Sequence, residues 1–331
     1  MQSSLKVTAA PLLQRLQQGL ARPPVELVQA PNLRWPFHAN HNRNTLRIAI
    51  LDSSFNPPTL AHLALANAAR PTFDKHKPNH EAAEEDYDAK LLLLSVKNVD
   101  KTLKPGDATY IQRLEMMELL AKHIRHHPPV TTTRTNSETG APNVAIAIID
   151  EPTFIGKSQV LLEFLRRRFQ SLSTSSEDGG SSTEPPEIEL TFLVGKDTLE
   201  RLFAPRYYAS ESFMVASLRK FMAPAPYGDN SRVVCAHRVS TSTIINPSAA
   251  EAEEAQARRT VKLAQEFVDN GRIAMIEIGD KLSRYSSSAV RGAIHAVGID
   301  DRDGREAVWK SLVSKDVAQY ITDSRLYVNN L

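Results

Sequence analysis

Short apolar runs separated by longer amphipathic stretches dominate the hydrophobic pattern of this chain. Three runs bounded by polar residues predict buried strands: Leu46–Leu51, Leu91–Val96 and Leu190–Val194. Weaker runs predict four further strands: Val144–Ile149, Phe213–Ser217, Val233–His237 and Ile273–Ile278. Helical spacing is clearest after Pro58 and in Tyr110–Ile124, Ser158–Phe169 and Ala249–Asn270. Strands that alternate with helices predict an α/β fold, a doubly wound parallel sheet with helices on both faces.

Three polar segments lie between the predicted strands and helices without changing their alternation. Residues 74–88, 131–143 and 171–187 have the composition of surface loops, and we interpret them as insertions into one domain that spans residues 44–331. Residues 1–43 form a predicted helical extension. Its first 25 residues contain no acidic side chain, and leucines recur at helical spacing, so a mitochondrial transit peptide is one interpretation. The favoured one is an amphipathic helix that packs on the domain with Leu16 and Leu20 facing inward.

Composition narrows the class of protein. The 331 residues are 41% hydrophobic and 24% charged, as in ordinary globular proteins, and the net charge of +2 predicts no nucleic-acid partner. The chain has no apolar run of about 18 residues, so we predict no membrane span. The single cysteine, Cys235, fits a reducing compartment, and we expect a cytoplasmic or nuclear protein. Arg166–Arg168 is interpreted as a solvated helix face rather than a localisation signal.

The most informative stretch is a strand–turn–helix around the sequence S-F-N-P-P-T-x-x-H. The predicted strand ends near Leu51, two prolines suit a turn into a first helical position, and a helix follows Thr59. Backbone N–H groups at such a helix start favour an anion. His62 follows Thr59 by three residues, so both side chains should face that anion site, where an imidazole can donate to phosphoryl oxygens.

A second candidate phosphate site lies near the C-terminus. The sequence R-Y-S-S-S-A-V-R follows a predicted strand, with Ser286 or Ser287 as the helix N-cap and Arg291 one turn later. Serine hydroxyls, helix-start N–H groups and a guanidinium can together hold phosphate oxygens.

The two motifs together resemble the signatures of the nicotinamide mononucleotide adenylyltransferase family, within the HIGH-motif nucleotidyltransferase superfamily. That family has SFNP-x-[HT]-x-x-H in the first motif and S-S-T-x-I-R in the second, and the ending Val317–Tyr327 is similar to its closing helix. The chain departs from the family pattern at Ser53, where glycine is usual, and at Ser288 and Val290, which replace Thr and Ile.

The resemblance implies roles for particular residues. His62, Thr59 and Arg291 would be catalytic; Ser54, Phe55, Asn56, Ser286 and Ser287 would bind ATP phosphates. The family's G-x-D, which contacts ribose, corresponds to Gly195 and Asp197, and Tyr208 stands where an aromatic ring stacks on nicotinamide. Lys104 and Arg238 are candidate nucleotide contacts.

The implied reaction joins ATP to a pyridine mononucleotide by in-line phosphate attack, giving a dinucleotide and pyrophosphate. Mg²⁺ is the implied cofactor, bridging substrate phosphates and held mainly by substrate and water, so no protein metal site is predicted. His123, His126 and His127 lack the Cys or Glu that would complete a metal set. The sequence around Gly156-Lys157-Ser158 lacks the first glycine of a phosphate loop, and we reject that interpretation.

Other functions stay open at this stage. A different phosphorylated acceptor would keep the fold and change the product of the adenylyl or cytidylyl transfer. A nucleotide-binding regulatory protein with weak ATP hydrolysis is the alternative from another class. The sequence does not separate nicotinamide from nicotinate mononucleotide, and it leaves a homo-oligomer open.

Overall fold

The structure of the chain is a computed structural model. This structure describes residues 4–37, 44–73, 86–97, 105–125, 143–174, 185–236, 262–297, 299 and 308–328. The predicted insertions lie largely outside these ranges, as do Lys104, His126, His127 and Arg238. No helix in the described ranges is long and apolar enough to cross a membrane.

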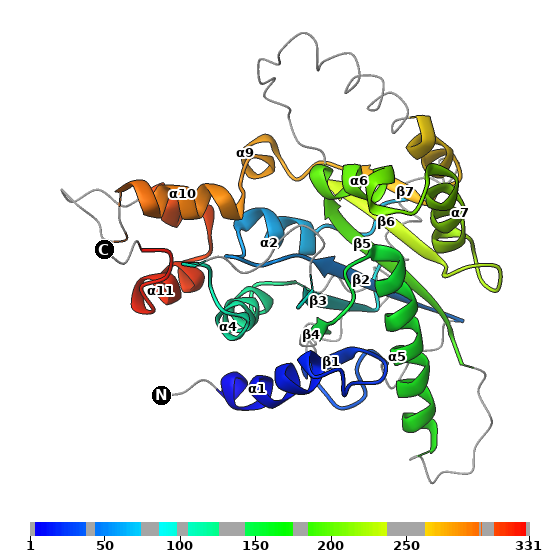
Figure 1. The fold of residues 1–331 in the computed structure, drawn as a ribbon, viewed down its shortest axis with the longest axis horizontal. Helices are drawn as coiled ribbons and strands as arrows, with labels where there is room; N and C mark the ends of the chain where they lie inside the picture. The colour runs from blue at the N-terminus through cyan, green and yellow to red at the C-terminus, as the bar shows by residue number, and fades with distance from the viewer. Residues whose placement is uncertain are drawn as a thin grey trace, which may run out of the picture.

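A seven-stranded sheet forms the centre of the molecule (Figure 1). Its strands lie in the order β1-β4-β3-β2-β5-β6-β7. Their bounds along the chain are β1 Val25–Gln29, β2 Thr45–Asp52, β3 Ala89–Ser95, β4 Val144–Ile149, β5 Glu187–Gly195, β6 Ser231–Ala236 and β7 Ile273–Ile276. β1 pairs antiparallel with β4, and every other pairing is parallel. The prediction of a doubly wound α/β fold is therefore confirmed, with one antiparallel edge strand added.

The strand order reverses between β2 and β5, which are neighbours in the sheet. From β2 the chain winds outward through β3 to β4, and from β5 it winds the other way through β6 to β7. A crevice forms beyond the carboxyl ends of the strands where the winding direction changes, and ligands of open α/β sheets bind there. The first motif follows β2 and the Gly195 segment ends β5, so both lie at this switch point.

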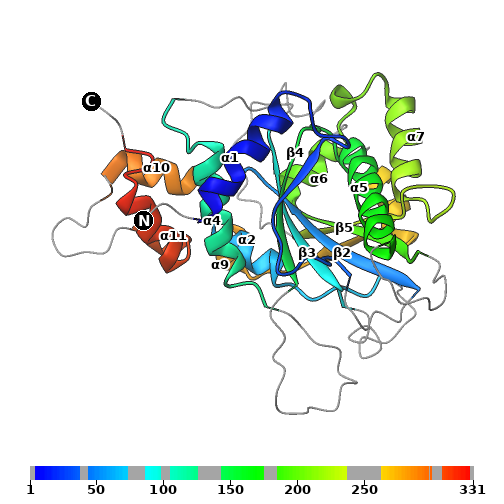
Figure 2. The same ribbon diagram turned by 90° about the horizontal axis from the view of Figure 1, so that it is seen from below.

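Helices cover both faces of the sheet (Figures 1 and 2). On one face lie α1 (Ser4–Gln17), α2 (Leu60–Ala66) and α4 (Tyr110–Ala121). On the other lie α5 (Phe154–Thr174), α6 (Lys196–Leu202), α7 (Glu211–Met222) and a helix at 262–269. Alternate strand residues enter the two cores: Ile48 and Ile50 pack on the α5 side, and Ala49 and Leu51 pack on the α4 side.

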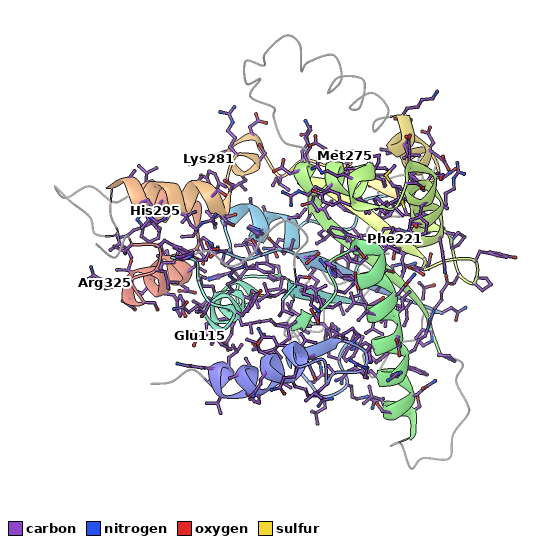
Figure 3. All side chains as sticks on the ribbon, in the orientation of Figure 1. Glu115, Phe221, Met275, Lys281, His295 and Arg325 are labelled. Carbon is purple, nitrogen blue, oxygen red and sulfur yellow. The ribbon has the colours of Figure 1, made fainter. Side chains whose placement is uncertain are left out.

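The C-terminal part of the chain builds a third core beside α4. The elements of this part are α9 (Asp280–Ser283), α10 (Ser287–Val297), η3 (Val308–Leu312) and α11 (Lys315–Asp323). One further short helix, η2 (Pro205–Tyr207), lies between α6 and α7 in the chain. In the third core, Val290, Trp309 and Ile321 pack on Met116 of α4. Glu115 of α4, labelled in Figure 3, accepts a hydrogen bond of 2.6 Å from the Tyr320 hydroxyl of α11. This packing brings the second motif next to the first.

One predicted strand is wrong, and one strand of the sheet was not predicted. Phe213–Ser217 is part of helix α7 rather than a strand, because Ser210 caps the helix and Met214, Leu218 and Phe221 are buried at helical spacing. Figure 3 shows Phe221 on that helix, on the side of the sheet covered by α7. Strand β1 was not predicted, since VELVQ is short and half polar.

The N-terminal segment is integrated with the domain. Leu16 of α1 is fully buried, as predicted, whereas Leu20 is 62% exposed because it lies beyond the end of the helix. The segment predicted as a helical extension also contributes β1 to the sheet. Arg168 is only partly solvated, contrary to prediction, because its guanidinium donates to the backbone oxygens of Trp35 and Leu33.

Candidate active site

The turn after β2 is built on buried groups. Phe55 has a left-handed backbone with φ of 44°, and its fully buried ring lies 5.6 Å from the ring of His62, centroid to centroid. Any contact of Phe55 with phosphate would therefore come from its backbone. Ser54 precedes Phe55 in the turn, and the backbone oxygen of Ser54 accepts a hydrogen bond of 3.3 Å from Arg113 Nη1.

Hydrogen bonds fix the ring of His62. The Thr59 backbone N–H donates to His62 Nδ1 at 3.0 Å, and Thr59 Oγ1 lies 2.9 Å from the same nitrogen. Since Nδ1 accepts a hydrogen bond, the neutral ring carries its proton on Nε2. His62 Nε2 lies 2.9 Å from Ser53 Oγ. The turn thus holds an imidazole N–H donor at the carboxyl end of β2.

The second motif lies directly against this turn. Ser286 caps α10, since its Oγ accepts a hydrogen bond of 3.1 Å from Ala289 N. Ser287 Oγ donates to the Pro57 backbone oxygen at 2.7 Å, across 230 positions of sequence. Arg291 Nη1 donates to the Asn56 backbone oxygen. The two motifs that the sequence analysis paired are therefore in contact.

Asn56 links the turn to the segment before α4 and to the C-terminal segment that resembles the family's closing helix. Its Nδ2 donates to Asp107 Oδ1 at 2.7 Å, and its Oδ1 accepts from Ala108 N at 3.2 Å and from the Tyr327 hydroxyl at 2.9 Å. The side chain is buried and engaged within the protein. The side chain therefore holds the turn in place, and the phosphate contact of Asn56 stays a prediction.

Asp107 and Arg113 form the charged support beneath this junction. Arg113 Nε donates to the Ala108 backbone oxygen at 2.8 Å, and Asp107 lies 3.7 Å from Arg113 Nη2 and 3.8 Å from Arg291 Nε. Burial lowers the pKa of Arg113, and the neighbouring Asp107 carboxylate opposes that shift. The signal for Arg113 was an arginine within an apolar helical pattern, beside the buried Leu114 and Met117.

A cavity of about 180 Å³ opens at the switch point, beside this turn. It extends from the ends of β2 and β3 to the start of α5, to α6 and to the end of η2. Its lining residues are Asp52, Ser53, Ser54, Ser95, Pro152, Thr153, Phe154, Lys157, Thr198, Arg201, Leu202, Tyr207 and Tyr208. His62 does not itself line the cavity, but Ser53, its hydrogen-bond partner, does.

One buried ion pair lies in the cavity wall. Lys157 Nζ lies 2.5 Å from Asp52 Oδ2, both side chains are almost fully buried, and the ammonium stands 5.0 Å from the Phe154 ring centroid. We had considered Lys157 only as part of a phosphate loop. Lys157 lies at the cavity because α5 begins at Phe154, three residues earlier, and no residue pattern near Lys157 indicates its ion pair with Asp52.

The predicted mononucleotide residues lie around the same edge. Gly195 ends β5 and precedes α6, and Asp197 is exposed in the first turn of α6, where Thr198 and Arg201 line the cavity. Tyr208 lines the cavity, and its hydroxyl donates to the Leu202 backbone oxygen at 2.8 Å. Burial raises the pKa of Tyr208 to about 12, so its ring is neutral at physiological pH. Lys104 and Arg238 lie outside the described residues.

Within the described ranges, no three His, Cys, Asp or Glu side chains converge as a metal site. His123 Nε2 lies 2.8 Å from Asp316 Oδ2, which joins α4 to α11.

The sheet order and the contact between the two motifs define a doubly wound, Rossmann-like fold whose two motifs meet at the switch point. The sequence is 26% identical over 247 residues to a Schizosaccharomyces pombe protein named "Putative nicotinamide mononucleotide adenylyltransferase", and the match covers 75% of each chain. This similarity confirms the family resemblance predicted from the motifs. No protein-family model matches the chain.

Two solved structures also align with the chain. Both are of the Plasmodium falciparum nicotinic acid mononucleotide adenylyltransferase, complexed with APC in one and with NaAD in the other. Each aligns with 85% of this chain and 97% of its own, with a TM-score of 0.40 and identities of 13% and 12%.

Proposed function

We propose that the protein transfers the adenylyl group of ATP to a pyridine mononucleotide, with nicotinamide mononucleotide as the first acceptor to test. The observation that carries this proposal is the contact between the two motifs at the switch point, through Ser287 and Pro57 and through Arg291 and Asn56. That contact brings an imidazole donor and a guanidinium to the same edge of the sheet, beside a cavity.

In the proposed reaction, a phosphate oxygen of the mononucleotide attacks the α-phosphorus of ATP. The new P–O bond forms as the bond to the β-phosphate breaks, and pyrophosphate leaves. No protein nucleophile or base is required, because the attacking phosphate is largely ionised near neutral pH. Catalysis then comes from positioning and from stabilising the growing negative charge.

His62 suits that task in its observed setting. The Thr59 N–H donates to Nδ1, so the neutral ring carries its proton on Nε2, where it donates to Ser53 Oγ on the side of the cavity and needs no second proton to act as a donor. Arg291 and the start of α10, with Ser286 and Ser287, would hold the β- and γ-phosphates. Since Ser287 and Arg291 also bond to the turn, ATP binding and the position of His62 should be coupled.

The cavity is the proposed mononucleotide site. Tyr208 and Phe154 offer aromatic faces to a pyridinium ring, and Arg201 and Lys157 supply positive charge in the wall. The Asp52 carboxylate is paired with Lys157, which leaves it a poor candidate for metal binding. We therefore propose that Mg²⁺ is held by the substrate phosphates and water, where it would neutralise phosphate charge.

A panel of acceptors tests the proposal. The protein is incubated with Mg-ATP and, separately, nicotinamide mononucleotide, nicotinate mononucleotide, FMN, phosphopantetheine or phosphocholine, and products are identified by mass spectrometry. We expect a pyridine dinucleotide and equimolar pyrophosphate with one or both of the first two acceptors. If a product forms only with one of the other acceptors, the protein would be a nucleotidyltransferase with a different acceptor. ATP binding without any transfer would favour a regulatory nucleotide-binding protein.

A further inference from the structure

Ser53 replaces the glycine of the family signature, and the structure gives its hydroxyl a defined place. Ser53 Oγ lies 2.9 Å from His62 Nε2, and Ser53 is one of the residues that line the cavity. His62 itself is not among the residues that line the cavity. Ser53 therefore connects the imidazole, through its hydroxyl, to the wall of the space that a ligand would fill.

The direction of this hydrogen bond follows from the other side of the ring. The Thr59 N–H donates to Nδ1, so Nε2 carries the proton and donates to Ser53 Oγ. The hydroxyl proton of Ser53 must then be directed elsewhere. In the described part of the chain its Oγ has no second hydrogen bond, and its backbone N–H is engaged with the Leu93 oxygen of β3 at 3.3 Å. The hydroxyl can therefore donate to a ligand oxygen in the cavity.

We propose that Ser53 is a further catalytic residue, whose hydroxyl donates to a phosphoryl oxygen of the reacting substrates while His62 donates to the hydroxyl. This inference rests on the proposed function. Hydrogen bonds in such a chain polarise one another, so the imidazole strengthens the hydroxyl as a donor. Ser53 keeps its proton and forms no covalent bond. It extends the reach of His62 to the cavity, where a glycine would leave a gap.

Three substitutions of Ser53 test this in the full-length protein, by pyrophosphate release from Mg-ATP and nicotinamide mononucleotide. Ser53→Ala and Ser53→Gly should each lower kcat by about 10- to 100-fold with KM for ATP changed by less than about threefold, as for a donor that acts in the transition state. Ser53→Thr keeps the hydroxyl and should retain most activity. Ser311→Ala, an exposed serine on η3, is the matched control.

A double variant separates a joint role from independent ones. If the two residues act as a unit, His62→Ala combined with Ser53→Ala should be only a few-fold slower than His62→Ala alone. Wild-type or faster turnover in both Ser53→Ala and Ser53→Gly would overturn the proposal, because the hydroxyl would then only occupy His62 until a ligand displaces it. Thermal unfolding of each variant excludes misfolding as the cause of a loss.

A spectroscopic measurement keeps this test separate from that of the proposed function. If the wild type shows no turnover, adenylyl transfer is contradicted. The hydrogen bond between Ser53 and His62 can still be tested in that case, by NMR of the imidazole. The ¹⁵N signals of the His62 imidazole should show an Nε2–H ring whose Nε2 shift changes when a non-hydrolysable ATP analogue and the mononucleotide bind. That change should be much smaller in Ser53→Ala. Equal changes in both proteins would overturn the role of Ser53.

Discussion

At the residue scale, Glu189 shows how this fold accommodates charge in its interior. The carboxylate of this β5 residue is buried, with Arg70 Nη2 at 2.9 Å and Arg232 Nε at 2.8 Å. Burial alone would raise the pKa of Glu189, but the two arginines outweigh it and hold the pKa below its ordinary value of 4.5. The ionised form is therefore bound more tightly in the folded protein than in the unfolded chain.

Glu189→Gln should reveal this as a pH-dependent loss of stability. A carboxyl with a lowered folded pKa contributes stability that is present above its unfolded pKa and is lost as pH falls through the folded value. At pH 7 we expect the variant to lose about 2–4 kcal/mol of unfolding free energy, since two largely buried arginines lose the carboxylate that neutralises them. The difference from wild type should shrink below pH 4.5 in urea titrations. Glu163→Gln, in an exposed pair with Arg167, should change stability by less than about 1 kcal/mol. A Glu189→Gln difference that stayed constant from pH 7 to pH 3 would contradict this account.

At the element scale, helix α1 packs on the domain through one apolar face. Leu5, Ala9 and Leu16 are buried at helical spacing against the sheet and α4. Gly19, with φ of 68°, then turns the chain out of the helix, which leaves Leu20 exposed.

The two leucines provide a matched pair for testing this docking. Leu16→Ala should lower the free energy of unfolding by about 2–5 kcal/mol, because it leaves a cavity in the core. Leu20→Ala makes the same chemical change at the surface and should stay within about 0.5 kcal/mol of wild type. Chemical denaturation of both variants measures the difference. Equal effects would mean that α1 does not pack on the domain as described.

The elements that could be predicted from the sequence are those whose pattern has one physical solution. Central strands such as β3 and β5 are covered on both faces and therefore appear as continuous apolar runs. The edge strand β1 is only five residues long and includes two polar residues, so its pattern is weak. The run at Phe213–Ser217 suits a strand or one turn of a buried helix, and only the neighbouring Leu218 and Phe221 decide for the helix.

At the scale of the whole molecule, the site is assembled from distant parts of the chain. The contacts of Asn56 with Asp107 and Tyr327 span 51 and 271 positions. His62 could be singled out because the S-F-N-P-P-T-x-x-H context is specific, and Ser287 and Arg291 because their weaker motif gains weight when it is paired with the first. The contacts of Asp107 and Tyr327 could not be predicted, since their sequence context does not indicate that these two side chains meet at Asn56.

Tyr327 offers a test of this long-range assembly. Tyr327→Phe removes one hydrogen bond to Asn56 and should cost about 1 kcal/mol of stability. Because the turn carries His62, turnover should also fall, by roughly 3- to 10-fold. Tyr320→Phe removes a hydroxyl that bonds to Glu115, away from the turn, and should cost similar stability without slowing turnover. Equal turnover in the two variants would show that the C-terminal contact does not position the turn.

The central claim is that the junction of the two motifs performs adenylyl transfer, and pyrophosphate release tests it most directly. Release from Mg-ATP is measured with and without nicotinamide mononucleotide, for wild type, His62→Ala and the control His123→Ala, whose imidazole pairs with Asp316. We predict release that requires the acceptor, falls by about 100- to 1,000-fold in His62→Ala and is unchanged in His123→Ala. Acceptor-dependent release at the wild-type rate in His62→Ala would contradict the account.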